Sequence, residues 1–201
     1  MSEDEFLSWY GPWESLTVPG VARLMDGFTG RWWIAGGHAI DAATGTRREH
    51  SDVDLVIAAD DLARFRAHRP DLQLWEPHNG SLTPLPAGRD LTPGREQLWA
   101  RRDATRPWLV DILLSPMDGT DWLFKRDHGI RLPAEAAIIT REGVGYLAPQ
   151  AVLLHKAHLL RDKDRRDFDV TVPLLDPTAR AWLAAALDRH LPGHEWRDRL
   201  R

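Results

Sequence analysis

The sequence contains no cysteine, which excludes a disulfide framework and any metal site built from thiolates. It also lacks an uninterrupted run of about 18 apolar residues, the length that a membrane-spanning helix needs. Its N-terminus has no signal-peptide pattern. We therefore expect a cytoplasmic protein without a membrane partner.

The sequence also has no excess of basic residues. The chain has 26 Lys and Arg against 30 Asp and Glu, a formal net charge of −4 and a sequence pI of about 6.1. General nucleic-acid binders gather Lys and Arg to contact phosphates, so nucleic acid is not an expected partner. A small cationic ligand suits this charge balance better.

The composition is otherwise that of a folded globular protein. With 201 residues, 43% hydrophobic and 28% charged, the chain can bury a core of its own. Ten tryptophans are many for this length, and they either fill the core or line an aromatic ligand cleft. The length fits one domain or a domain with a small appendage.

The stretch from Ile34 to Ile57 combines a strand, a glycine pair and two aspartates. Residues 31–35 read as a strand, Gly36 and Gly37 allow a close backbone turn, and a helix can begin over residues 38–44. A helix N-terminus presents free N–H groups and a positive dipole end, so a phosphate could bind at this turn.

Two carboxylates follow at a spacing of two residues. In a predicted strand over residues 52–58, Asp52 and Asp54 share one face. Neighbouring carboxylates repel each other unless a cation lies between them, and oxygen ligands favour Mg²⁺ or Mn²⁺. The pattern thus predicts a metal site, with a solvated strand end as the alternative.

A third carboxylate interrupts an apolar strand further along the chain. Residues 96–101 and 108–115 are predicted to form an antiparallel hairpin, and Asp111 lies within its second arm. A carboxylate in such a run is costly to bury without a partner. Asp111 is therefore either a further metal ligand and catalytic base or the partner of Arg101 in a structural salt bridge.

The remaining elements come from hydrophobic periodicity and from Pro, Gly and Asp signals. We predict a short N-terminal helix broken at Gly11-Pro12, helices over 18–28 and 60–68, the latter capped by Asp60-Asp61, short strands at 72–75 and 81–85, and a strand pair within 122–132.

The C-terminal part reads as helical. One helix is predicted from Pro149 to about Val172, with Lys156 and Lys163 on a single stripe, and a last helix follows Asp176. The fold class is thus α/β (α+β), a small mixed sheet flanked by helices with a C-terminal helical segment. The predicted domains are residues 1–140, including the N-terminal helical extension, and residues 141–201.

A glycine turn, an Asp-x-Asp strand and a third aspartate suit phosphoryl or nucleotidyl transfer, in which metal ions neutralise a triphosphate. At this point the sequence resembles the nucleotidyltransferase superfamily related to DNA polymerase beta, and within it the aminoglycoside-2''-adenylyltransferases. The resemblance covers roughly residues 30 to 172. It rests on Ile34-Ala35-Gly36-Gly37-His38-Ala39-Ile40-Asp41, Arg48-Glu49-His50-Ser51-Asp52-Val53-Asp54, Gln97-Leu98-Trp99-Ala100-Arg101 with Pro107-Trp108-Leu109-Val110-Asp111, Tyr146-Leu147-Ala148-Pro149-Gln150 with Leu153-Leu154-His155-Lys156-Ala157, and Lys163-Asp164-Arg165-Arg166-Asp167-Phe168.

The resemblance implies roles for individual residues. Asp52 and Asp54 would bind the metal, and Asp111 would be the catalytic base or third metal ligand. The nucleotide would be bound by a second set of residues: Gly36, Gly37, His38, Lys156 and Lys163. His38 departs from the pattern, because relatives usually have tryptophan there.

The expected reaction is transfer of a nucleoside monophosphate, with ATP or another NTP as co-substrate and Mg²⁺ or Mn²⁺ as cofactor. The expected acceptor is a small cationic molecule such as an aminoglycoside, which would make the protein an antibiotic-resistance enzyme, a monomer or homodimer. Two alternatives stay open: transfer to a protein or RNA, as in toxin–antitoxin relatives, and a nucleotide-binding protein that does not catalyse.

Overall fold

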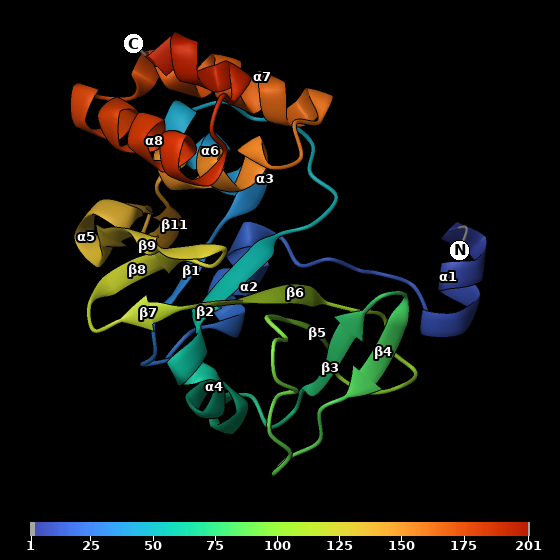
Figure 1. Ribbon diagram of the computed structural model, residues 1–201. Helices are drawn as coiled ribbons and strands as arrows, with labels where there is room; N and C mark the ends of the chain where they lie inside the picture. Colours follow the sequence, from blue (N-terminus) through green and yellow to red (C-terminus); the bar gives the residue numbers. More distant parts are fainter. Residues whose placement is uncertain (1–2, 201) are drawn as a thin grey trace. The chain divides into compact units, whose positions relative to one another are not determined.

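The computed structural model describes residues 3–200 (Figure 1), and the chain divides into two compact units. Unit 1 comprises the chain up to Trp32 together with Ser51–Pro116, and unit 2 comprises Trp33–His50 together with the chain from Met117 onward. The first two residues of the predicted N-terminal extension lie outside the described residues. The predicted domain boundary after residue 140 stays a prediction.

Unit 1 is built on five strands in the order β2-β6-β5-β3-β4. Their bounds are β2 Asp54–Ala58, β3 Gln73–His78, β4 Ser81–Pro84, β5 Gln97–Arg101 and β6 Val110–Ser115. β2 and β6 are parallel, whereas the other neighbours are antiparallel. The predicted hairpin of residues 96–101 and 108–115 is therefore confirmed, and the predicted short strands at 72–75 and 81–85 correspond to β3 and β4.

The helices of unit 1 differ in length from the prediction. They are α1 Glu3–Tyr10, α2 Val18–Leu24, the 3₁₀ turn η1 Ala59–Asp61 and α4 Leu62–His68. The prediction of a helix up to residue 28 was wrong, because the chain leaves the helix at Met25 and Gly27 adopts a left-handed φ of 72°.

Asp61 occupies the predicted N-cap position of α4 but does not cap the helix with its side chain. Its buried carboxylate instead accepts hydrogen bonds from the backbone N–H and Nε of Arg31 and from Nη1 of Arg64. Burial opposes ionisation of this carboxyl group, but these donors outweigh it and lower the pKa of Asp61.

Tryptophans account for much of the packing in unit 1. Trp99 and Trp108 lie 5.6 Å apart between ring centroids and so pack against each other across the hairpin. Trp13 packs edge-on against Trp99 at 5.0 Å. The guanidinium of Arg101 lies over the ring of Trp108 at 4.3 Å, a cation–π contact.

Unit 2 contains two groups of strands. In the first, β1 Trp32–Ile34 pairs in parallel with β11 Val144–Leu147, which pairs antiparallel with β10 Ile138–Arg141. In the second, β8 Asp121–Phe124 lies between β7 Met117–Asp118 and β9 Asp127–Pro133. The predicted strand pair within 122–132 is confirmed, whereas β10 and β11 were missed.

Unit 2 also contains several helices. They are α3 Gly36–Thr44, α5 Ala134–Ala137, α6 Pro149–Ala157, α7 Asp162–Thr171, α8 Pro177–His190 and the 3₁₀ turns η2 Val172–Leu174 and η3 Glu195–Leu200. The predicted single helix from Pro149 to Val172 was wrong. Leu160 adopts a left-handed φ of 49° and separates α6 from α7.

The last helix begins where the sequence predicts. Asp176 accepts a hydrogen bond from the backbone N–H of Ala179 at 2.8 Å and so caps α8. Leu183 and Leu187 are fully buried on this helix. Within residues 3–200, every helix is too short or too polar to cross a membrane.

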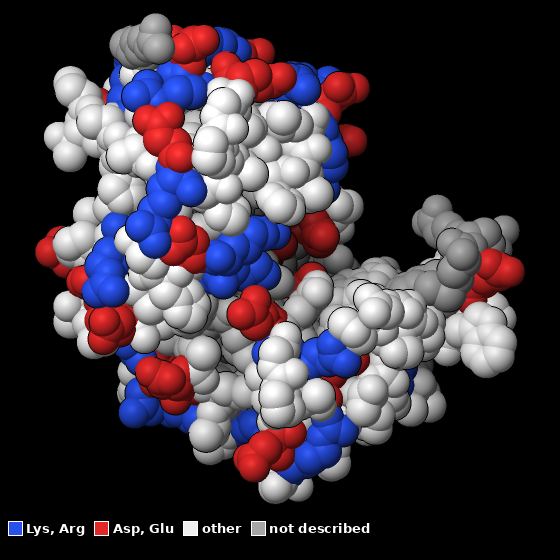
Figure 2. All heavy atoms as spheres, viewed as in Figure 1, with Lys and Arg blue, Asp and Glu red and all other residues white. Residues whose placement is uncertain are grey.

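Side chains of both charge signs are interspersed across the face drawn in Figure 2. Many of them form ion pairs within one unit, such as Arg189 with Asp127 at 2.6 Å and Arg199 with Asp169 at 2.7 Å. Exposed pairs of this kind contribute little to stability, because water and salt screen the attraction.

Candidate active site

Two of the three predicted catalytic aspartates lie side by side in unit 1. Asp54, the first residue of β2, is in register with Asp111 on the neighbouring parallel strand β6. Residues in register on adjacent strands direct their side chains to the same face of the sheet. Both residues are half-buried, and Oδ1 of Asp111 is itself buried.

Asp52 lies outside this strand. β2 begins at Asp54, so the prediction of a strand from residue 52 was wrong, and the two-residue period does not apply to Asp52. Its carboxylate is exposed and accepts a hydrogen bond from the hydroxyl of Ser51 at 3.1 Å. A place for Asp52 among the metal ligands therefore stays a prediction.

The carboxylate of Asp111 is oriented by the neighbouring strand β5. The side-chain amide of Gln97 donates a hydrogen bond to Oδ2 of Asp111 at 2.6 Å. Arg101, which the sequence left open as a partner of Asp111, instead lies over the rings of Trp75 and Trp108. Burial lowers the pKa of Arg101. The structure therefore does not bear out the alternative in which Asp111 forms a structural salt bridge with Arg101.

Asp54 and Asp111 alone do not make a complete metal site. Among residues 3–200, no group of three or more His, Asp or Glu side chains is arranged to hold a metal ion. Mg²⁺ is commonly bound through one or two carboxylates, with the other ligands supplied by waters and substrate phosphates. Asp54 and Asp111, as adjacent oxygen donors on one face, fit that pattern.

The glycine turn predicted to receive phosphate lies in unit 2, where β1 ends and α3 begins. Gly36 has a left-handed φ of 62°, which favours glycine at that position. A Cβ atom added at Gly37 would lie 2.5 Å from both Nη2 of Arg48 and Cε1 of His50. Gly37 is therefore needed for the close approach of these two side chains.

Two histidines meet beside this turn. The rings of His38 and His50 lie 4.0 Å apart, and Nε2 of His50 is 2.8 Å from Oδ2 of Asp41. Burial opposes ionisation of Asp41, but hydrogen bonds from His50, the Arg48 backbone N–H and Thr46 outweigh it and lower the pKa of Asp41.

Lys156 and Lys163, predicted to share one helical stripe, lie on different helices, α6 and α7. Lys156 on α6 is buried, and its ammonium group is 2.8 Å from Asp167 and 3.3 Å from Asp164. Lys163 is exposed on the first turn of α7. Whether either lysine contacts a nucleotide stays a prediction.

Sequence reasoning missed the functional candidate Arg48. Its guanidinium donates to Oδ2 of Asp167 at 3.1 Å and lies against Gly37. The only available signal was the position of Arg48 inside one of the quoted motifs. The partner, Asp167, belongs to another of these motifs 119 residues away, and nothing in the sequence joins the two.

Comparisons with known proteins bear directly on this arrangement. Residues 17–68, which include the glycine turn and both Asp52 and Asp54, match the family described as Aminoglycoside-2''-adenylyltransferase. Two solved structures show a similar course of the chain. The crystal structure of ANT(2'')-Ia in complex with adenylyl-2''-tobramycin has a TM-score of 0.55 at 14% identity, covering 85% of this chain and 94% of that one. The lincomycin-bound lincosamide antibiotic adenylyltransferase LnuA has a TM-score of 0.51 at 16% identity, covering 87% and 99%.

The chain has a nucleotidyltransferase fold. At these identities the structural likeness concerns the fold, and it confirms the predicted α/β class with mixed sheets flanked by helices. The family match adds that the resemblance to aminoglycoside adenylyltransferases is confirmed over residues 17–68. The matching family and both similar structures are adenylyltransferases, the class of enzyme that the sequence predicted. The sequence matches none of the curated proteins with which it was compared.

Proposed function

We propose that this nucleotidyltransferase fold carries out adenylyl transfer, moving AMP from ATP to a hydroxyl group of a small cationic acceptor such as an aminoglycoside. The observation that carries the proposal is the pair Asp54 and Asp111, held in register on adjacent parallel strands. The match of residues 17–68 to an aminoglycoside adenylyltransferase family supports it.

In the proposed reaction, Asp54 and Asp111 bind a divalent cation, Mg²⁺ or Mn²⁺, with Asp52 as a further ligand. The bound cation would neutralise the charge of the triphosphate and of the leaving pyrophosphate. Gln97 fixes the carboxylate of Asp111 through its hydrogen bond. Alternatively Asp111 accepts the proton of the acceptor hydroxyl as that oxygen attacks the α-phosphorus.

The nature of the acceptor is the more specific part of the proposal. One similar structure holds adenylyl-2''-tobramycin and another holds lincomycin, so hydroxyl-bearing antibiotics of both kinds are the first acceptors to test. The net charge of −4 favours a cationic acceptor over a polyanionic one. ATP as donor places the proposed reaction in the cytoplasm.

The test is release of pyrophosphate by the purified protein with each NTP, Mg²⁺, and tobramycin or lincomycin as acceptor. We expect release with ATP and at least one antibiotic, and a mass increase of the antibiotic by one adenylyl group. Asp54→Asn should abolish the reaction, whereas Asp60→Asn, a change at an exposed aspartate of the same unit, should not.

The outcomes separate the proposal from its alternatives. Hydrolysis or self-labelling without antibiotic modification would contradict the proposed acceptor, and labelling of a protein or RNA in a cell lysate would favour the macromolecular alternative. Nucleotide binding without turnover by any acceptor, unchanged in Asp54→Asn, would favour a protein that binds nucleotide and does not catalyse.

A further inference from the structure

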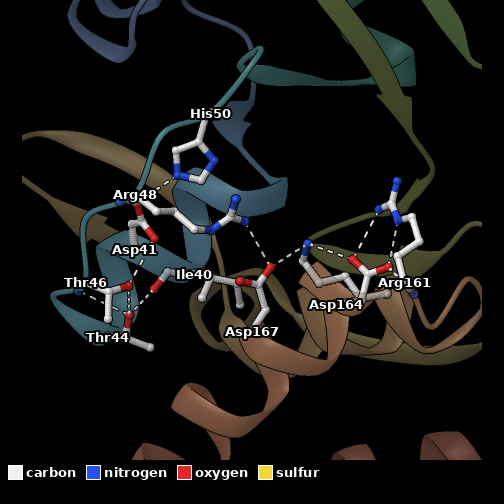
Figure 3. Close-up of polar contacts among 10 residues, drawn as sticks. Ile40, Asp41, Thr44, Thr46, Arg48, His50, Arg161, Asp164 and Asp167 are labelled. Carbon is white, nitrogen blue, oxygen red and sulfur yellow. Dashed lines mark hydrogen bonds and ion pairs between the residues drawn. The ribbon is translucent and has the colours of Figure 1, made fainter.

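A network of ion pairs with two buried carboxylates joins α6, α7 and the stretch before β2 (Figure 3). Its two carboxylates, Asp164 and Asp167, are 0% and 3% exposed. Lys156 reaches both of them, Arg161 pairs with Asp164 at 2.8 Å, and Arg48 pairs with Asp167 at 3.1 Å. Three cations thus surround two carboxylates.

The inner part of this network is fixed by local structure. The carboxylate of Asp164 also accepts the backbone N–H of Arg161 at the start of α7, so it ties the helix N-terminus to Lys156. Burial opposes its ionisation, but the Arg161 hydrogen bond and the charge of Lys156 prevail and lower the pKa of Asp164. Asp164 therefore holds the ammonium group of Lys156 in place, and Lys156 in turn pairs with Asp167.

The outer part of the network reaches the glycine turn. Asp167 lies one helical turn after Asp164 on α7, and Oδ2 of Asp167 is shared by Lys156 at 2.8 Å and Arg48 at 3.1 Å. Arg48 belongs to the stretch between α3 and β2, and its Nη2 occupies the space that a side chain on residue 37 would fill. Asp167 thereby determines where this guanidinium lies.

We propose that Asp167 is a positioning residue that acts through Arg48. Its carboxylate, held in place by Lys156, orients the guanidinium of Arg48 against Gly37 at the first turn of α3. In this arrangement Lys156 serves as the internal counter-ion of Asp167, and Nη2 of Arg48, which pairs with Asp167, is also the atom that lies against Gly37. The role in catalysis rests on the proposed function, because it is the nucleotide that this turn would receive.

The substitution that tests the proposal is Asp167→Asn, which removes the charge and keeps the size of the side chain. With Arg48 no longer fixed, we expect KM for ATP to rise about tenfold while kcat changes less than about threefold, as for loss of one charge-assisted contact in binding. Asp167→Glu, which restores the charge, should recover part of the affinity.

The matched control is Asp169→Asn on the same helix. Asp169 pairs with Arg199 at 2.7 Å and is half-exposed, so the same chemical change leaves the Arg48 contact intact. We expect wild-type kinetics for this control. Equal KM values in Asp167→Asn and Asp169→Asn would overturn the proposal.

Gly37→Ala disturbs the position of Arg48 directly, without changing Asp167. The methyl group would displace Arg48 and His50, whose clashing atoms are ends of flexible side chains, so the fold should persist. We expect a rise in KM for ATP similar to that of Asp167→Asn, and the double variant should be little worse than either single one. Additive effects would mean that the two residues act separately and would contradict the proposal.

Limited trypsin digestion tests the positioning without any enzymatic activity. Cleavage after Arg47 and Arg48, mapped by mass spectrometry, should be several-fold faster in Asp167→Asn than in Asp169→Asn, because the stretch is no longer anchored. If no substrate is ever turned over but this difference is seen, the proposed function fails and the positioning holds. If cleavage rates are equal, the positioning fails whatever the activity.

Discussion

At the scale of single residues, Asp111 is both a predicted catalytic residue and a hydrogen-bonded member of strand β6. Its carboxylate accepts a hydrogen bond from Gln97 and lies in register with Asp54. An amide oxygen could still accept the Gln97 hydrogen bond, so Asn in place of Asp removes the charge and spares the local geometry. Asp111 can therefore be tested with little risk of unfolding the protein.

We predict that Asp111→Asn lowers kcat at least about 100-fold, the scale of losing a catalytic base or a metal ligand. Single-turnover release of pyrophosphate measures the effect, and thermal unfolding should show a Tm within a few degrees of wild type. Asp103→Asn, in the turn of the same hairpin, is the control and should retain wild-type rates. Substantial activity in Asp111→Asn would remove Asp111 from the catalytic residues.

Some site residues could be predicted from the local sequence, whereas contacts between distant residues could not. Sequence reasoning singled out Asp54 by its two-residue spacing to Asp52, and Asp111 because a carboxylate within an apolar strand is an anomaly. The contact of Arg48 with Asp167 could not be found in this way, since each is an ordinary charged residue and 119 positions separate them. Only the packing of α3 against α7 brings the two side chains together.

At the scale of elements, the mistakes have local causes. The helical pattern runs through residues 149–172, but the left-handed Leu160 breaks it, and Arg161 stands at an N-cap position where Ser, Thr, Asp or Asn would have been the signal. The β10-β11 hairpin turns at Glu142 and Gly143, both with positive φ. A Glu-Gly pair is a weaker hairpin signal than Asn-Gly or Asp-Gly, so this hairpin was missed.

One element of unit 2 carries a pH-sensitive group. His155 on α6 packs against the ring of Phe124 on β8, with centroids 4.9 Å apart, and lies near the guanidinium of Arg126. Burial, followed by the charges of Arg126, Lys125 and His190, lowers the pKa of His155 from 6.5 to about 3. The folded protein thus keeps this imidazole neutral under conditions in which the unfolded chain protonates it.

The sign of the effect follows from proton binding. Above pH 6.5 neither state protonates His155, and between pH 6.5 and about 3 only the unfolded state does, so the free energy of unfolding falls as the pH falls. We predict that His155 alone accounts for a loss of about 2 kcal/mol between pH 7 and pH 5. Urea unfolding at both pH values measures it. His155→Gln should remove this part of the pH dependence, whereas His128→Gln, at an exposed position on β9, should leave it; a loss equal in wild type and His155→Gln would contradict the assignment.

At the scale of the whole molecule, neither compact unit is a continuous piece of the chain. Unit 2 takes Trp33–His50 from the first quarter of the sequence and joins it to the chain from Met117 onward. α3 packs against both α6 and α7, and β1 supplies the parallel partner of β11. The helical C-terminal part therefore depends on a segment that lies more than 100 residues earlier, as the Arg48–Asp167 pair illustrates.

We predict from this that residues 141–201 do not fold as an isolated fragment. Seven of the nine residues of α6 are buried, so this helix needs covering on every side, and the fragment lacks both α3 and the β7-β8-β9 sheet. Asp167 would also lose Arg48 and keep only Lys156 as counter-ion. Far-UV circular dichroism should show little helix and no cooperative thermal transition for the fragment, while the full chain at the same concentration unfolds cooperatively. A cooperative transition in the fragment alone would mean that the residues after 140 form an autonomous domain, and that the contacts with α3 add to a fold already complete.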